Sequence, residues 1–224
     1  MNPNSFTNRF PITSFLLLLN GGFFALQMIG EHLLGLSRGE VMQDLGAIRG
    51  GEIYSGQYWR LISGTFLHGN ILHVAMNCWV LFDLGCFCEP RLSKSKFFSI
   101  YVFSALGGAL ASYSWPAIAL VLRSDGFVSL EKAISVVAGG RLTLLEGAVF
   151  KDFFIHMSVG CSGALAGLLG LLLVYSIKER HAALRAMLVK WILMIALITF
   201  MLPNIDPVSY THLRAHETRH DLVC

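Results

Sequence analysis

The chain has 224 residues, of which 54% are hydrophobic and only 14% are charged. A soluble globular domain usually carries about 25% charged residues, so lipid must cover part of this protein's surface. The formal net charge of +3 is small and comes from short clusters, which argues against a nucleic-acid partner. The five cysteines include no C-x-x-C pair, and they predict neither a disulfide framework nor a zinc site.

Five apolar stretches predict membrane-spanning helices, because a span needs about 20 mostly apolar residues. They are residues 10–30, 61–82, 97–122, 153–177 and 186–201. The first is long enough to cross a bilayer and lacks a basic n-region, so it is not a cleavable signal peptide. We therefore predict an all-α fold, a polytopic transmembrane helical bundle.

The linkers between these spans predict the orientation of the protein in the membrane. Linkers 89–96 and 178–185 each carry three basic residues, whereas linkers 31–60 and 123–152 balance basic against acidic residues. Lys and Arg concentrate on the cytoplasmic side. We therefore expect a cytoplasmic N-terminus, the two longer linkers outside, and residence in the cell (inner) membrane.

The second predicted span contains His73 and Asn77, which are four residues apart and so share one helix face. Polar side chains inside a membrane are costly and usually functional. The alternative is that both side chains hydrogen-bond a neighbouring helix and only hold the bundle together. Their joint occurrence at this spacing favours a functional role.

The fourth predicted span contains Ser162 beside a G-x-x-x-G face made by Gly163 and Gly167. Such a face permits close helix approach, and a membrane serine often bonds its own helix, so each feature alone has a structural explanation. In the predicted topology, however, Ser162 lies near the outer leaflet at a depth similar to that of His73 and Asn77. A serine nucleophile needs donors aimed at the developing oxyanion and a base within hydrogen-bond reach.

The combined pattern resembles that of the rhomboid intramembrane proteases, from about residue 45 to residue 201. The matching residues are Trp59-Arg60, His68, His73, Asn77 and Gly160-Cys161-Ser162-Gly163.

The resemblance implies that Ser162 is the nucleophile and that His73, Asn77 and the Ser162 backbone N–H form the oxyanion hole. Trp59 and Arg60 would lie in the outer first loop and help to fix the fold, and His68 would have a supporting polar role. The second outer linker is longer than the family's usual one.

The general base is the main departure from the family, whose members carry it as a histidine on a sixth span. Here residues 204–206 resemble the lead-in to that span, but residues 210–224 resemble translated sequencing adapter. His212 matches the expected position, although Arg214 replaces a glycine. We therefore expect a rhomboid-like membrane domain at 1–206 and a non-native tail at 207–224.

The absent sixth span would be the close partner of the Gly163/Gly167 face, and the chain as written would be inactive without it.

The complete protein is thus predicted to be an intramembrane serine endopeptidase that uses a Ser–His dyad without metal or cofactor. Its partners would be the lipid bilayer and single-span transmembrane substrates. The alternative is a catalytically inactive rhomboid-like protein that binds membrane clients. A small transporter would show matching halves with broken spans, and no such symmetry is visible.

Overall fold

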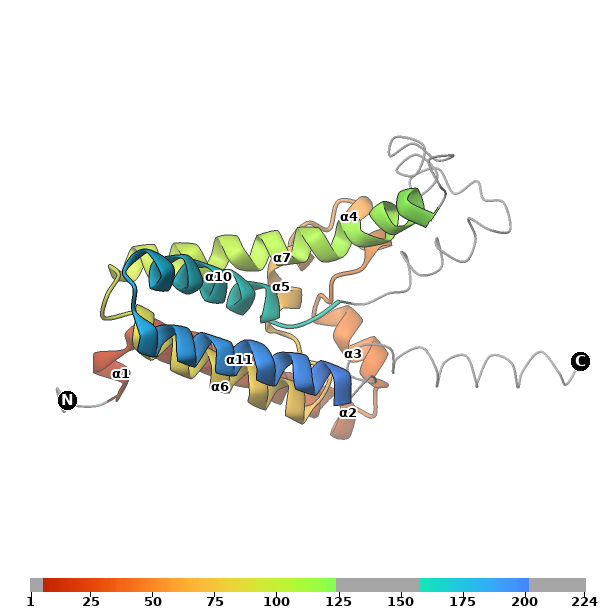
Figure 1. The fold of residues 1–224 in the computed structure, drawn as a ribbon. Coiled ribbons are helices and arrows are strands. Elements are labelled where there is room, and N and C mark those ends of the chain that lie inside the picture. The colour runs from red at the N-terminus through yellow and green to blue at the C-terminus, as the bar shows by residue number, and fades with distance from the viewer. Residues whose placement is uncertain (1–5, 124–157, 202–224) are drawn as a thin grey trace, which may run out of the picture. The chain divides into compact units, whose positions relative to one another are not determined.

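The computed structural model describes residues 6–123 and 158–201, and these residues form helices joined by turns (Figure 1). The long helices are α2 (Pro11–His32), α6 (Ile71–Cys88), α7 (Lys94–Arg123), α10 (Ser162–Lys178) and α11 (Ala182–Met201). The short ones are α1 (Phe6–Arg9), α3 (Arg38–Asp44), α4 (Gly50–Tyr54), α5 (Arg60–Ser63) and the 3-10 turn η1 (Gly64–Phe66). The predicted all-α fold class is confirmed for this part of the chain.

Three of the described helices are long and apolar enough to cross a bilayer, namely Pro11–His32, Ile71–Cys88 and Lys94–Ser114. Helix α10 is apolar but shorter, with 17 residues. Three of the helices match the predicted spans within four residues at each end. The second span covers Ile71–Cys88 rather than 61–82, because α5, η1 and a turn precede it, and the fourth begins at Ser162 rather than at 153.

The chain divides into two compact units, Met1–Gly170 and Leu171–Cys224. The first contains α1 to α7 and the start of α10. The second contains the rest of α10 and helix α11. The predicted domain boundary at 206, the tail after it and residues 124–152 of the predicted second outer linker lie outside the described residues.

In the first unit, Glu89 caps the N-terminus of α2 from the far end of α6. Helix α2 begins without a side-chain cap of its own. Glu89 accepts hydrogen bonds from the Ile12 N–H at 2.8 Å, the Thr13 N–H at 2.9 Å and the Thr13 hydroxyl at 2.7 Å. A carboxylate at this end also complements the helix dipole. Glu89 thus joins two spans that are distant in sequence.

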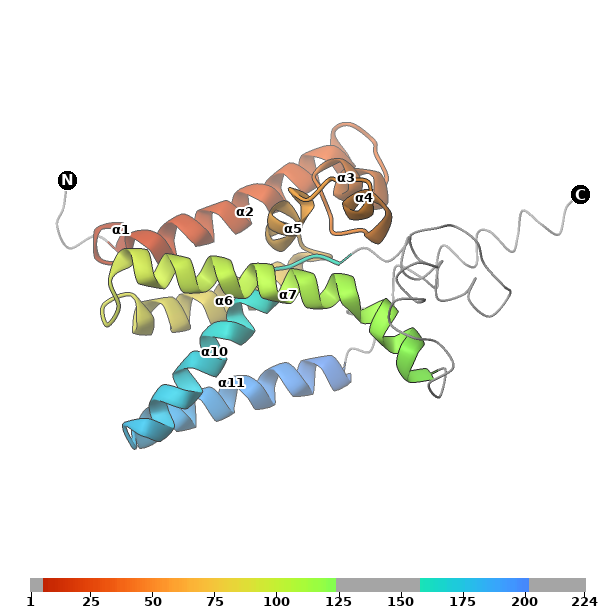
Figure 2. The ribbon, with the colours of Figure 1, turned by 90° about the horizontal axis from the view of Figure 1, so that it is seen from above.

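Helices α7 and α10 approach each other closely through small residues, and both figures of the ribbon show the start of α10 beside α7 (Figures 1 and 2). A Cβ added to Gly163 would lie 2.9 Å from the Gly108 Cα, and one added to Gly167 would overlap the Ser104 side chain. The prediction that a sixth span is the close partner of this glycine face is wrong. That partner is α7, because its Ser104 and Gly108 are themselves small enough to admit α10.

In the second unit, a tight turn of residues 179–181 joins α10 to α11. Arg180 adopts a left-handed φ of 52°, and the His181 N–H donates to the Ser176 carbonyl at 3.0 Å. The His181 Nδ1 then accepts from the Leu184 N–H at 3.3 Å, so this histidine caps α11. The turn makes these hydrogen bonds within its own segment and contains the exposed basic residue Arg180.

We predict that Glu89→Ala lowers the free energy of unfolding by about 1.5–3 kcal/mol, because it leaves the buried Thr13 N–H and hydroxyl without their acceptor. Glu89→Gln should have a smaller effect, since the amide keeps one acceptor oxygen. Thermal unfolding in detergent measures the difference. The matched control is Glu179→Ala, an exposed glutamate that should change stability by no more than about 0.5 kcal/mol. Equal effects of Glu89→Ala and Glu179→Ala would contradict the capping role.

Candidate active site

The turn before α6 determines where the helix that carries His73 begins. Asn70 is the N-cap of α6, and its Oδ1 accepts from the His73 N–H at 2.8 Å. Buried Gln27 of α2 pairs with the backbone of His68: its Nε2 donates to the His68 carbonyl at 2.9 Å and its Oε1 accepts from the His68 N–H at 3.0 Å. This pairing supplies the hydrogen bonds that the backbone of His68 lacks because it is not part of a helix.

His68 is fully buried beneath the site. Its Nδ1 lies 3.1 Å from the Phe66 carbonyl, which can only accept, so Nδ1 carries the proton. Burial, and secondarily the neighbouring His73, lower the pKa of His68 to about 4. The ring is therefore neutral at physiological pH. It packs edge-on against the His73 ring with the centroids 5.0 Å apart, which places the predicted supporting residue directly behind His73.

His73 and Asn77 occupy successive turns on one face of α6, as their spacing predicts. Asn77 is only 8% exposed, and its Nδ2 has no hydrogen-bond partner among the described residues. The His73 Nδ1 accepts from the Gly69 N–H at 3.4 Å. In a neutral imidazole whose Nδ1 is an acceptor, Nε2 is the protonated nitrogen. Both side chains thus present a donor.

The segment that leads into Ser162 is held in an extended conformation by the first loop and by α7. Ser158 forms an antiparallel bridge with Ile48, through N–H···O bonds of 3.1 and 2.9 Å. The Ser112 hydroxyl of α7 donates to the Ser158 hydroxyl at 2.6 Å, and the Gly160 N–H donates to the Gly64 carbonyl at 3.0 Å. These bonds fix the chain up to the residue before Cys161.

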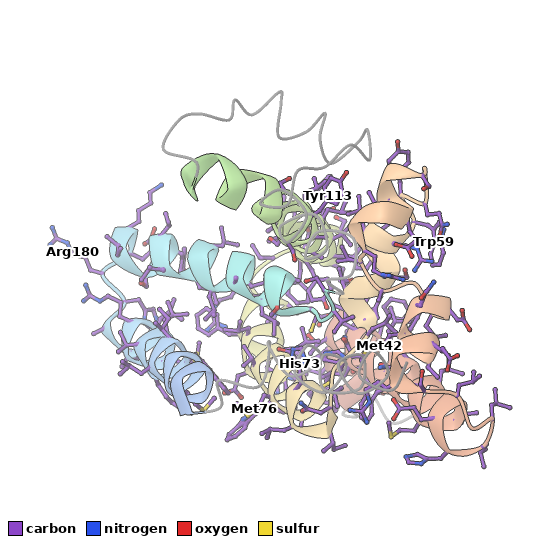
Figure 3. All side chains as sticks on the ribbon, turned by 90° about the vertical axis from the view of Figure 1, so that its right-hand side faces the viewer. Met42, Trp59, His73, Met76, Tyr113 and Arg180 are labelled. Atoms are coloured by element: carbon purple, nitrogen blue, oxygen red, sulfur yellow. The ribbon has the colours of Figure 1, made fainter. Side chains whose placement is uncertain are left out.

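Gly160 is the point at which this segment meets the two donors of α6, and Figure 3 shows His73 there beside the start of α10. Its φ of 113° lies in the region that favours glycine. A Cβ at Gly160 would lie 3.0 Å from the His73 Nε2 and 3.5 Å from the Asn77 Nδ2. The absence of that Cβ lets the backbone approach both side chains, two residues before Ser162.

Ser162 is the first residue of α10 and is exposed, whereas its neighbour Cys161 is fully buried. Its backbone N–H belongs to the unpaired first turn of a helix, where the helix dipole favours negative charge. Ser162 follows Gly160 by two residues in the sequence, and the structure places Gly160 beside the His73 and Asn77 side chains. His212, the predicted base, lies outside the described residues.

Arg60 makes the hydrogen bonds that hold the first loop, and Trp59 lies against it. The guanidinium of buried Arg60 donates to the Gln43 carbonyl at 2.8 Å and to the Ala47 carbonyl at 3.2 Å. The Trp59 ring stacks on this guanidinium at 4.8 Å. Arg60 thereby holds the loop segment from Gln43 to Ala47, and the next residue, Ile48, pairs with Ser158.

Sequence reasoning missed Gln27, Asn70 and Ile48, which hydrogen-bond the backbone of the segments that lead into α6 and α10. The sequence indicates a structural role for Gln27, since an uncharged polar side chain inside a predicted span needs a partner. It also indicates a capping role for Asn70, because asparagine directly before an apolar helix is typical of an N-cap. Within the described ranges, no three His, Cys, Asp or Glu side chains gather into a metal-ligating cluster.

Comparison with known families identifies the chain. The model of the Rhomboid domain matches residues 55–214, well over half of the sequence. The chain belongs to the rhomboid family. The match continues past residue 206 and so includes His212.

Several curated rhomboids are similar to this one. The Rhomboid protease AarA of Providencia stuartii is 28% identical over 171 residues, covering 75% of this chain and 51% of that protein. RHOMBOID-like protein 5 of Arabidopsis thaliana is 30% identical over 62% of this chain and 41% of its own length. The Rhomboid protease GluP of Bacillus subtilis is 27% identical over 82% of this chain and 30% of its length. The chain thus spans about half or less of these relatives, and no solved structure matches it.

Family membership and the apolar helices indicate an integral membrane protein, and the curated bacterial relatives named here are rhomboid proteases.

We predict that Gly160→Ala disrupts this rhomboid's site. The new Cβ would press on the His73 ring at 2.9 Å and force alanine to a φ of 113°, a strain of about 1–3 kcal/mol. Thermal unfolding should show this loss of stability. The matched control is Gly170→Ala, in the same helix as Ser162 with nothing within 4 Å of its Cβ, which should be neutral or slightly stabilising. Equal stability of the two variants would contradict the close approach.

Proposed function

We propose that this rhomboid is an intramembrane serine endopeptidase in which Ser162 is the nucleophile. His73, Asn77 and the Ser162 backbone N–H would hold the oxyanion. The proposal rests above all on the Asn77 Nδ2, a buried donor without a partner among the described residues that lies beside Gly160. An unpaired buried polar group costs about 1–3 kcal/mol. Such a group calls for an explanation, and an oxyanion that forms only during reaction would be its partner.

The charge of the reaction would develop where these donors converge. When Ser162 Oγ attacks the scissile carbonyl carbon, the carbonyl oxygen becomes negative. Donors that are already oriented in a site shielded from water stabilise this charge without reorganising. The N-terminus of α10 adds the favourable end of its helix dipole. The neutral His68 behind His73 introduces no competing charge.

Proton transfer needs a histidine base, and we assign this role to a histidine after α11, for which His212 is the candidate. The base takes the Ser162 hydroxyl proton during attack and gives it to the leaving amine when the C–N bond breaks. A water then attacks the acyl ester, losing a proton to the same histidine. This step releases the carboxylate product and returns the proton to Ser162. Neither a metal nor a cofactor is required by this sequence of steps.

The substrates would be single-span membrane proteins with small residues and a weak helix near the scissile bond, because the peptide must leave its helix to reach Ser162. With a cytoplasmic N-terminus, cleavage would occur near the outer leaflet of the cell membrane. The basic turn between α10 and α11 supports this orientation.

Cleavage of a co-expressed single-span substrate tests the proposal. Ser162→Ala should abolish cleavage, and Asn77→Ala should lower kcat by about 10²–10³-fold, the usual effect of losing one oxyanion donor. Asn77→Ala should not lower the thermal stability, because the Nδ2 that it removes has no partner among the described residues. The matched control is Ser14→Ala, which removes from α2 a buried hydroxyl that also has no partner in the described part of the chain, and it should leave kcat unchanged.

Wild-type cleavage by Ser162→Ala would remove this serine from the mechanism. An Asn77→Ala protein that is destabilised but has normal turnover in its folded fraction would assign Asn77 to packing. If the wild-type protein retains membrane clients without cleaving them, the client-binding alternative replaces the protease.

A further inference from the structure

The turn of residues 68–70 is stabilised almost entirely by side chains, although it carries the backbone into α6. Gln27 pairs with both polar backbone atoms of His68. Arg38 Nη1 donates to the Gly69 carbonyl at 2.8 Å, and Asn70 accepts from the His73 N–H. The two peptide planes that flank Gly69 are therefore each held by a side chain from elsewhere in the fold.

Arg38 is itself held in place by α2. Its Nε and Nη2 both donate to the Glu31 carboxylate at 2.9 Å, in the paired geometry that suits a planar guanidinium. The third donor, Nη1, is then directed at Gly69. The Arg38 side chain is 49% exposed, and ion pairs of this kind contribute little to stability. Its effect on Gly69 can therefore be separated from an effect on folding.

The peptide plane between His68 and Gly69 has a direct consequence for His73. A peptide unit is planar, so the bond from Gln27 to the His68 carbonyl also fixes the direction of the Gly69 N–H. That N–H points at the His73 Nδ1 at 3.4 Å. An N–H facing Nδ1 requires an unprotonated nitrogen there, which leaves the proton on Nε2, the nitrogen that faces Gly160.

We propose that Gln27 and Arg38 are positioning residues that fix the turn at Gly69, and thereby hold His73 in the tautomer that donates from Nε2. This inference deepens the proposed role of His73 in the oxyanion hole and rests on it for its catalytic meaning. The tautomer itself is a property of the resting protein. It can be measured whether or not the protein cleaves a substrate.

The test is ¹⁵N NMR of the imidazole nitrogens in the full chain in detergent at pH about 8, above the ordinary histidine pKa of about 6.5. Signals of His73 are assigned by their absence in His73→Gln. In the wild type, Nε2 should be protonated and Nδ1 unprotonated. In Gln27→Leu and in Arg38→Ala, the tautomer ratio should shift toward Nδ1–H by about 2- to 10-fold, the usual worth of one hydrogen bond.

Three control variants separate positioning from general disruption. Arg49→Ala breaks another ion pair of the first loop, with Glu52, and Ser14→Ala removes another buried polar group of α2. Both should leave the His73 signals unchanged. The charge swap Glu31→Arg with Arg38→Glu keeps an ion pair but places a carboxylate, which cannot donate, against the Gly69 carbonyl. It should behave like Arg38→Ala.

Unchanged His73 signals in both Gln27→Leu and Arg38→Ala would overturn the inference, as would rescue of the signals by the charge swap. With an active protein, both variants should lower kcat with little change in KM, by up to about 10²-fold, as expected for a displaced catalytic group. Failure of the protease proposal would appear differently, as unchanged cleavage by Ser162→Ala and Asn77→Ala with the tautomer shift intact.

Discussion

Backbone N–H and C=O groups that leave a helix in apolar surroundings need partners from within the protein, because lipid supplies none. Two non-helical segments of this rhomboid meet that constraint at the same end of the first unit. The turn at residues 68–70 is held by Gln27, Arg38 and Asn70. The extended residues 158–160 are held by Ile48, Gly64 and Ser112. Each segment leads directly into a helix that carries a site residue, so satisfying the backbone also positions the site.

Against this background, two buried side-chain nitrogens of the site lack a partner among the described residues. They are the His68 Nε2, which is an acceptor because Nδ1 carries the proton, and the Asn77 Nδ2, which is a donor. The side chains around it are arranged so that backbone atoms are satisfied, and Gly160 has no Cβ to fill the space beside it. The first loop has an indirect part in this arrangement: Arg60 holds the loop at Gln43 and Ala47, and the next residue, Ile48, pairs with Ser158. The loop therefore acts through backbone hydrogen bonds rather than by contributing a reactive group.

The sequence predicted the parts of this arrangement that depend on periodicity. Spans follow from apolar length, and the shared face of His73 and Asn77 follows from a spacing of four. The start of α6 could not be obtained from hydropathy, because residues 61–67 are as apolar as a helix and only the Asn70 cap ends the loop. The sequence places Glu89 in a basic linker, and it does not show that the hydrogen-bond partners of this residue, Ile12 and Thr13, lie on α2. The Gly163/Gly167 face indicates a close neighbouring helix but does not identify it. Ser104 and Gly108 of α7 are small residues with the same spacing of four, and the pattern alone does not pair the two faces.

The central claim is that Asn77 and His73 are preorganised to receive an oxyanion formed at Ser162. A structure of the protein after reaction with a fluorophosphonate tests it most directly, because the phosphoryl oxygen of the Ser162 adduct stands where the oxyanion would form. We predict that this oxygen lies about 2.7–3.1 Å from the Asn77 Nδ2 and from the His73 Nε2, with Gly160 unmoved. An adduct whose oxygen faces away from both nitrogens, with Asn77 still unpaired, would contradict the account.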